Sequence, residues 1–119
     1  MSDAVGRERA GQPENLSRFF VERANAGDVE GLVALYEADA VLAFPSGQVT
    51  TGAQAIRQAY EQMLADRPQF APGDQRPALH NGDLALTSTR TATGATVEVA
   101  RHQPDGTWLW IIDHPSILG

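Results

Sequence analysis

Two acidic residues of this 119-residue chain occupy positions where a carboxyl group is unusual. Glu98 stands between valines in a strand-like stretch, and Asp113 ends the apolar sequence WLWIID. The other acids fit helix faces, helix ends, turns or the start of the chain, where carboxylates meet water. Buried side by side, two carboxyl groups share a proton and can act as general acid and general base. In the alternative, Glu98 faces solvent from an antiparallel strand and Asp113 marks a strand end.

The other ionisable residue types limit the kinds of catalysis that the chain can perform. The chain has no cysteine, and all nine of its basic residues are arginines. This composition excludes thiolate catalysis, cysteine-ligated metals and lysine Schiff bases. His80, His102 and His114 do not have the spacing of a metal-binding motif, so we expect neither a metal nor another cofactor. Acid–base chemistry is left to carboxylates, histidines and tyrosines.

Charge and hydropathy limit the partners and the location. The formal net charge is −6 and no basic stripe is present, so nucleic acid and anionic membranes are poor partners. No apolar run is long enough to span a bilayer, and no secretory signal opens the chain. We therefore expect a cytoplasmic protein, and arginine without lysine suggests a bacterial source.

The pattern along the chain predicts helices first and strands afterwards. We interpret residues 1–12 as a flexible tail and residues 13–119 as a single domain. Helical spacing follows Pro13, a second short helix begins at Asp28 and carries Tyr36 on its apolar side, and Thr51 opens a third with a capping box. After Pro68, turn signals separate strand-like stretches, an order typical of an α+β domain. These stretches are 75–80, 84–91, 95–103 and 107–114.

Several short sequences resemble the nuclear transport factor 2-like superfamily, most closely its SnoaL-like and ketosteroid-isomerase-like branch. The resemblance covers about residues 13–117. It implies a cone-shaped, strongly bent antiparallel sheet closed by about three N-terminal helices, with a small-molecule pocket between them. The sequences that carry it are GD at the second helix, LYEADAV, the Pro–x–Gly turn after it, HNG at 80–82, DGTW at 105–108 and IDHPS.

Compared residue by residue, the chain departs from the ketosteroid isomerases. Phe44 occupies the position that matches their general base, and Phe19 the position that matches their oxyanion tyrosine. Phenylalanine can neither accept nor donate a proton, so we do not expect isomerisation by that mechanism. The resemblance retains two supporting tyrosines, at Tyr36 and Tyr60, and matches Glu98 to the second oxyanion acid.

The resemblance also gives Asp113 the inward parity of Glu98 on the neighbouring strand. We therefore predict a small-molecule pocket protein with Glu98 and Asp113 as candidate catalytic residues. It would be an isomerase-, cyclase- or dehydratase-like acid–base enzyme acting on an apolar, ring-containing substrate. The alternative is a non-catalytic module that binds a ligand or dimerises. The expected pocket residues are Phe19, Tyr36, Phe44, Tyr60 and Ile111, with His80 and His114 at the mouth.

Strand alternation leads to two further expectations. Asp113 and His114 are adjacent, so their side chains should point to opposite faces and not form a dyad. If Glu98 and Asp113 face inward, an apolar set faces outward, and exposing it would be unusual for a monomer. We therefore predict a homodimer that buries Val97, Val99, Trp108, Trp110 and Ile112.

Overall fold

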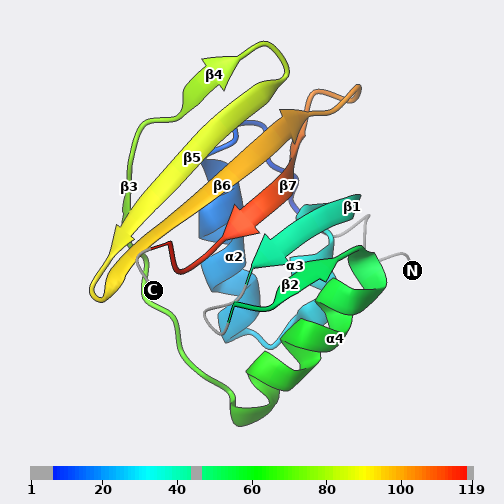
Figure 1. Ribbon diagram of the computed structural model, residues 1–119, viewed down its shortest axis with the longest axis vertical. Coiled ribbons are helices and arrows are strands. Elements are labelled where there is room, and N and C mark those ends of the chain that lie inside the picture. Colours follow the sequence, from blue (N-terminus) through cyan, green and yellow to red (C-terminus); the bar gives the residue numbers. More distant parts are fainter. Residues whose placement is uncertain (1–6, 44–46, 118–119) are drawn as a thin grey trace.

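The computed structural model describes residues 7–43 and 47–117. Helices come first and most strands follow, as predicted for an α+β domain (Figure 1). No helix among the described residues is long and apolar enough to cross a membrane. The elements are α2 (Asn15–Asn25), α3 (Val29–Val33), β1 (Tyr36–Ala43), β2 (Val49–Thr51), α4 (Ala53–Met63), the 3₁₀ turn η1 (Leu64–Asp66), β3 (Asp74–Gln75), β4 (Leu79–Asn81), β5 (Leu84–Thr91), β6 (Gly94–His102) and β7 (Trp108–His114).

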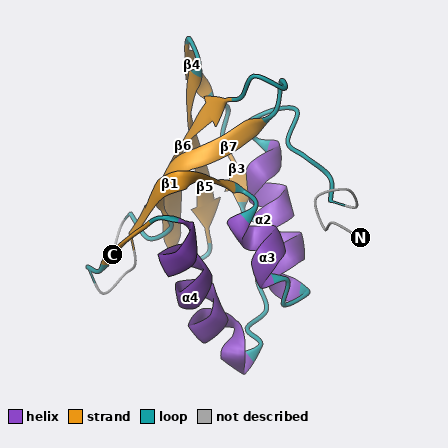
Figure 2. Ribbon diagram, turned by 90° about the vertical axis from the view of Figure 1, so that its right-hand side faces the viewer, coloured by secondary structure: helices purple, strands orange, loops and turns teal. Residues whose placement is uncertain are grey.

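The strands form one 7-stranded sheet in the order β2-β1-β7-β6-β5-β3, with β4 also paired to β5. The predicted antiparallel meander is present as β5, β6 and β7. The pairing of β1 with β7 is parallel, so the sheet is not entirely antiparallel. Figure 2 shows α2, α3 and α4 on one side of the sheet, and we call the side that they cover the inner face.

Local sequence explains most of the helix ends. The Asp28 side chain caps α3 as predicted, because its Oδ1 accepts a hydrogen bond of 3.0 Å from the Gly31 N–H. The predicted capping box at Thr51 is wrong. Gly52 is the N-cap of α4, at φ 92°, and its position has no side-chain cap.

Two further sequence predictions change at element boundaries. Tyr36 was expected on a helix, but α3 ends at Val33 and Tyr36 opens β1 beside β7. The expected strand at 75–80 is divided into β3 and β4. Pro77 lies between the two pieces and lacks the N–H that a continuous ladder needs.

The described part of the expected tail, residues 7–12, packs against the domain. The Ala10 carbonyl accepts a hydrogen bond of 2.9 Å from the Trp108 N–H, and Ala10 is buried. Arg7 forms an ion pair of 2.7 Å with Asp28 at the start of α3. This segment therefore extends the fold at the start of β7 instead of projecting from it.

Strand β7 contains a β-bulge. Val99 pairs with Ile112, but the next residue of β6, Ala100, pairs with Trp110. Ile111 is therefore an extra residue on β7 with no partner of its own on β6. A bulge of this kind reverses the alternation of side chains beyond it.

The bulge corrects the predicted orientation of the tryptophans. Continuous alternation from Asp113 would place Trp108 and Trp110 on the outer face, yet they are only 7% and 2% exposed. Both tryptophans belong to the hydrophobic core under the helices, and Asp113 is buried as well. Ile112 is 48% exposed on the outer face, as predicted.

Candidate functional site

Glu98 and Asp113 lie side by side on the inner face of the sheet. They are direct partners across β6 and β7, and the same row continues to Thr87 on β5 and Leu42 on β1. Opposed residues in such pairs have Cβ atoms about 4.5–5.5 Å apart. Glu98 is 3% exposed and Asp113 is 4% exposed, so neither carboxyl lies on a solvated surface.

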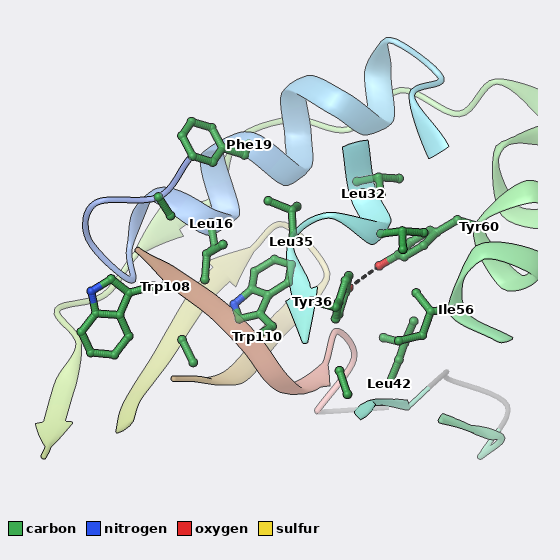
Figure 3. Packing of buried hydrophobic residues seen from close by; sticks show 14 of the residues in the cluster. Leu16, Phe19, Leu32, Leu35, Tyr36, Leu42, Ile56, Tyr60, Trp108 and Trp110 are labelled. Carbon is green, nitrogen blue, oxygen red and sulfur yellow. Dashed lines mark hydrogen bonds between the residues drawn. The ribbon is translucent and has the colours of Figure 1, made fainter. Parts of the chain in front are cut away.

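Hydroxyl groups bind both carboxyls. The Tyr36 hydroxyl donates to Asp113 Oδ2 at 2.5 Å, and the Tyr36 and Tyr60 hydroxyls are also 2.5 Å apart. Figure 3 shows this second bond between β1 and α4. Tyr36 has one hydroxyl hydrogen, so when Asp113 receives it, Tyr60 must donate to Tyr36. On the other acid, Thr87 Oγ1 donates to Glu98 Oε1 at 2.7 Å.

Burial changes the ionisation of every group in this network. Desolvation, with the nearby charge of Glu98, raises the pKa of Asp113 to about 8, although the hydrogen bond from Tyr36 opposes the shift. Desolvation also raises the pKa of Glu98, against hydrogen bonds from Thr96 and Thr87. Desolvation and the charge of Asp113 raise the pKa values of Tyr36 and Tyr60 far above the ordinary tyrosine value. The two carboxyls therefore titrate as a pair that keeps one proton at neutral pH.

This arrangement supplies a proton donor and a proton acceptor on one face. The protonated acid can donate a hydrogen bond to a carbonyl or hydroxyl oxygen, and the ionised acid can accept a proton. Since the pKa of Asp113 is raised to about 8, Asp113 is the better candidate for the donor and Glu98 for the acceptor. The tyrosines fix the orientation of Asp113.

Aromatic side chains surround the hydroxyl chain. The Phe20 ring lies 6.2 Å from the Tyr60 ring and 6.4 Å from the Trp110 ring, measured between centroids. Phe19, the residue expected in the pocket, faces elsewhere. Its ring lies 4.6 Å and 5.0 Å from the guanidinium carbons of two arginines, Arg18 and Arg23, and Figure 3 shows it far from the tyrosine pair.

The remaining predicted site residues are not gathered around the carboxyls. Ile111 is the half-buried bulge residue. His80 is exposed, with its ring edge-on against Trp108, 5.6 Å between centroids. His114 pairs with Val97, so it lies on the face opposite to Asp113. Phe44 lies outside the described residues.

Sequence reasoning missed several neighbours of the acids. Thr87 and Thr96 hydrogen-bond to Glu98, and Phe20 borders Tyr60. On β5 the buried positions alternate as Ala85, Thr87 and Thr89. Polar residues at alternate positions of a strand are a usable signal once the phase of the neighbouring strand is known.

Two cavities lined by described residues lie away from the carboxyls. One, of about 60 Å³, lies between residues 7–10 and the start of β7. The other, of about 340 Å³, lies between the end of α2 and the segment after α4. Neither cavity is lined by Glu98 or Asp113. Among the described residues, no three His, Asp or Glu side chains are grouped so that they could hold a metal ion.

Solved structures share this fold at low sequence identity. A candidate calcium/calmodulin-dependent protein kinase type II association domain from Thiobacillus denitrificans matches at a TM-score of 0.76 and 16% identity, over 95% of this chain and 100% of that one. A candidate dehydratase of the nuclear transport factor 2-like family from Streptomyces avermitilis matches at 0.71 and 22%, over 88% and 93%. A ketosteroid isomerase-like protein from Erwinia carotovora matches at 0.69 and 20%, over 89% and 93%.

No curated protein matches the chain. The sequence model of the SnoaL-like domain does match it, over residues 17–115. That range runs from the first turns of α2 to the end of β7 and includes every member of the carboxyl and hydroxyl network. The chain belongs to the SnoaL-like domain family.

Proposed function

We propose that this protein binds an apolar, ring-containing small molecule by its carbonyl or hydroxyl group and transfers a proton on it. Asp113 donates a hydrogen bond to the ligand oxygen, and the Glu98 carboxylate accepts a proton from the ligand. The observation that carries the proposal is the buried cross-strand pair, in which both acids are aligned and hydroxyl groups bind them.

The two roles follow from the surroundings of each acid. Asp113 is enclosed by the tyrosine chain, and its pKa of about 8 keeps it protonated at neutral pH. Proton removal next to a carbonyl leaves negative charge on the oxygen, where a buried donor stabilises it best. Such a proton transfer is the shared step of isomerase-, cyclase- and dehydratase-like reactions.

Exchange with deuterated solvent tests proton transfer without knowledge of the substrate. A ring ketone such as 2-tetralone is incubated with the protein in D₂O, and deuterium next to the carbonyl is measured by NMR. We expect faster exchange than in buffer, and loss of the acceleration in Glu98→Gln. Stabilisation of the folded protein by the ketone in a thermal-shift assay, without exchange, would instead favour a binding protein.

An association module is the second candidate, because the outer face carries an uncharged row. Leu79, Leu86, Val99 and Ile112 are successive partners across β4, β5, β6 and β7. Three of them are strongly exposed, at 70% for Leu79, 41% for Leu86 and 48% for Ile112. The solved neighbours include a candidate association domain.

We propose a second copy of the same chain as the occupant of this face. The chain has a net charge of −6, and a row without charges is where two such copies can approach with least repulsion. We include Val97, Val99 and Ile112 in the proposed interface, since their pairing puts them on the outer face, and we leave out Trp108 and Trp110, which are buried.

Sedimentation at tens of micromolar, a range in which ordinary dimers form, tests the interface. We expect a dimer for the wild type and a monomer for Ile112→Glu. Ala26→Glu is the matched control, since Ala26 is exposed at the end of α2 on the other side of the sheet, and it should remain dimeric. A monomeric wild type would exclude the association module.

A further inference from the structure

A short segment joins η1 to β3 and lies against the end of α2. We call this segment, residues 67–73, the strap. The Asn25 side chain forms two hydrogen bonds with the middle of the strap. Its Nδ2 donates to the Phe70 carbonyl at 2.9 Å, and its Oδ1 accepts from the Phe70 N–H at 2.7 Å. At its end, Gly73 touches β5 so closely that an added Cβ would lie 2.5 Å from Thr89 Cγ2. The strap therefore bridges α2 and the sheet.

Phe70 is the outermost ring of a series that leads to the carboxyl pair. Its ring meets Phe20 edge-on, with 5.4 Å between centroids. Phe20 in turn borders Tyr60 and Trp110. Tyr60 begins the hydroxyl chain that ends on Asp113. Phe20 and Phe70 are only partly buried, so this series connects the acids with the surface beside the strap.

An unsatisfied polar group lies under the other end of the strap. Thr89 is 8% exposed, and its hydroxyl has no hydrogen-bond partner among the described residues. It pairs across the strands with Thr96, whose hydroxyl binds Glu98. A buried hydroxyl without a partner is costly, and a polar group of a ligand would satisfy it.

The strap also has room to move. The cavity of about 340 Å³ lies directly beside it, lined by Asn25, Leu64, Pro68 and Gln69 among others. Both hydrogen bonds between Asn25 and Phe70 are exposed, so water can replace them. Glu98 and Asp113 are almost completely buried and line neither of these two cavities, so a ligand needs an opening to arrive there.

We propose that the strap is the entrance to the carboxyl pair, and that Phe70 occupies the place of a ligand ring. A planar ring displaces Phe70, packs against Phe20 and brings a hydroxyl or carbonyl group beside Thr89. The two hydrogen bonds between Asn25 and Phe70 hold the strap in its closed position. The choice of a ring-bearing ligand rests on the proposed function, whereas the existence of the entrance does not.

Cysteine labelling tests the entrance, because the natural chain has no cysteine. In Thr89→Cys, the rate of reaction with iodoacetamide, followed by mass spectrometry, reports access under the strap. Adding Asn25→Ala should raise this rate roughly tenfold, as loss of two hydrogen bonds favours the open form. Gln69→Ala, an exposed change on the strap itself, is the matched control and should leave the rate unchanged.

A second cysteine separates opening of the strap from unfolding. Ala85 is buried on the same face of β5, and Ala85→Cys should label equally slowly with or without Asn25→Ala. If Asn25→Ala fails to fold, Phe70→Leu replaces it. Two results would refute an entrance at the strap. In the first, Thr89→Cys reacts at the same rate when combined with Asn25→Ala as when combined with Gln69→Ala. In the second, Asn25→Ala accelerates labelling equally at Thr89→Cys and at Ala85→Cys.

The ring is tested with two probes of the same carbon skeleton. 2-Naphthol should slow the labelling of Thr89→Cys in the Asn25→Ala background, while the saturated, non-planar 2-decalol should not. Equal protection by both, or by neither, overturns the placement of a planar ring at Phe70. Labelling involves neither carboxyl, so this result is independent of proton exchange in Glu98→Gln.

Discussion

Asp113→Asn removes a proton-binding group from the buried pair and keeps an oxygen that can accept the Tyr36 hydrogen bond, so its effect on stability should depend on pH. Below about pH 4, Asp113 carries its proton in both the folded and the unfolded chain. As pH rises, the unfolded chain, with a pKa of 3.8 at this residue, releases the proton first, and the folded chain holds it up to about pH 8. The wild type therefore loses stability across this range, and the asparagine variant does not.

The size of the effect follows from the distance between the two pKa values. The range from 3.8 to about 8 is about four pH units, and at about 1.4 kcal/mol for each unit the loss reaches about 6 kcal/mol. Relative to the wild type, Asp113→Asn should thus gain several kcal/mol in the free energy of unfolding between pH 4 and pH 8. Above pH 8 the difference should stay constant.

Urea unfolding followed by far-UV circular dichroism, at each pH unit from 4 to 8, measures this difference. Asp105→Asn is the matched control, because hydrogen bonds from Thr107 lower the pKa of Asp105, so its titration is complete near pH 4 and its difference from the wild type should stay nearly constant from pH 4 to pH 8. Glu98→Gln removes a charge that raises the pKa of Asp113. The stability of this variant should therefore stop falling at a lower pH than the stability of the wild type does. A difference between Asp113→Asn and wild type that is the same at every pH would refute a shared proton.

Five other substitutions, one of them a control, test local contacts of the fold and the site by denaturant unfolding. Tyr36→Phe should cost about 1–3 kcal/mol, since it leaves two buried partners unsatisfied, and Tyr60→Phe should cost less, because the bond to Asp113 remains. Gly73→Ala should cost about 1–3 kcal/mol through the clash with β5, while Gly11→Ala, with open space around its Cα, should cost almost nothing. Asp28→Ala should cost about 1 kcal/mol through the lost cap of α3; the Arg7 hydrogen bond lowers the pKa of Asp28, so this cost should disappear as pH falls below about 4.

The strand part of the fold was predictable from local signals. Turn residues at Asn81–Gly82, Thr93–Gly94 and Pro104–Gly106 bound β5, β6 and β7 within about a residue of the expected limits. The order of helices before strands gave the α+β class. The parallel pairing of β1 with β7 was not visible, because it joins segments far apart in the chain.

The site was predictable only in part. Alternation alone favoured a solvated Glu98, and the family resemblance raised the case for the inner face. Phe19 and Phe20 are both apolar on one helix, and neighbouring residues point about 100° apart, so the sequence could not decide which ring faces the tyrosines. Thr89 and Phe70 became candidates only through contacts between segments that are far apart in the chain. A local sequence pattern does not predict such contacts.

The bulge at Ile111 makes chain length, as well as residue identity, a determinant of the chemistry. A β7 of the same sequence without the bulge would turn Ile112 toward Glu98 and leave Asp113 in water. Deleting Ile111 would instead keep both tryptophans and Asp113 in their present pairings, since the extra residue has no partner on β6. A substitution at Ile111 leaves this register unchanged, because the pairing of β6 with β7 does not involve that residue. Single-residue insertions or deletions elsewhere in β7, which shift the register on one side of the bulge, are the changes that decide whether Glu98 and Asp113 stay paired on the inner face.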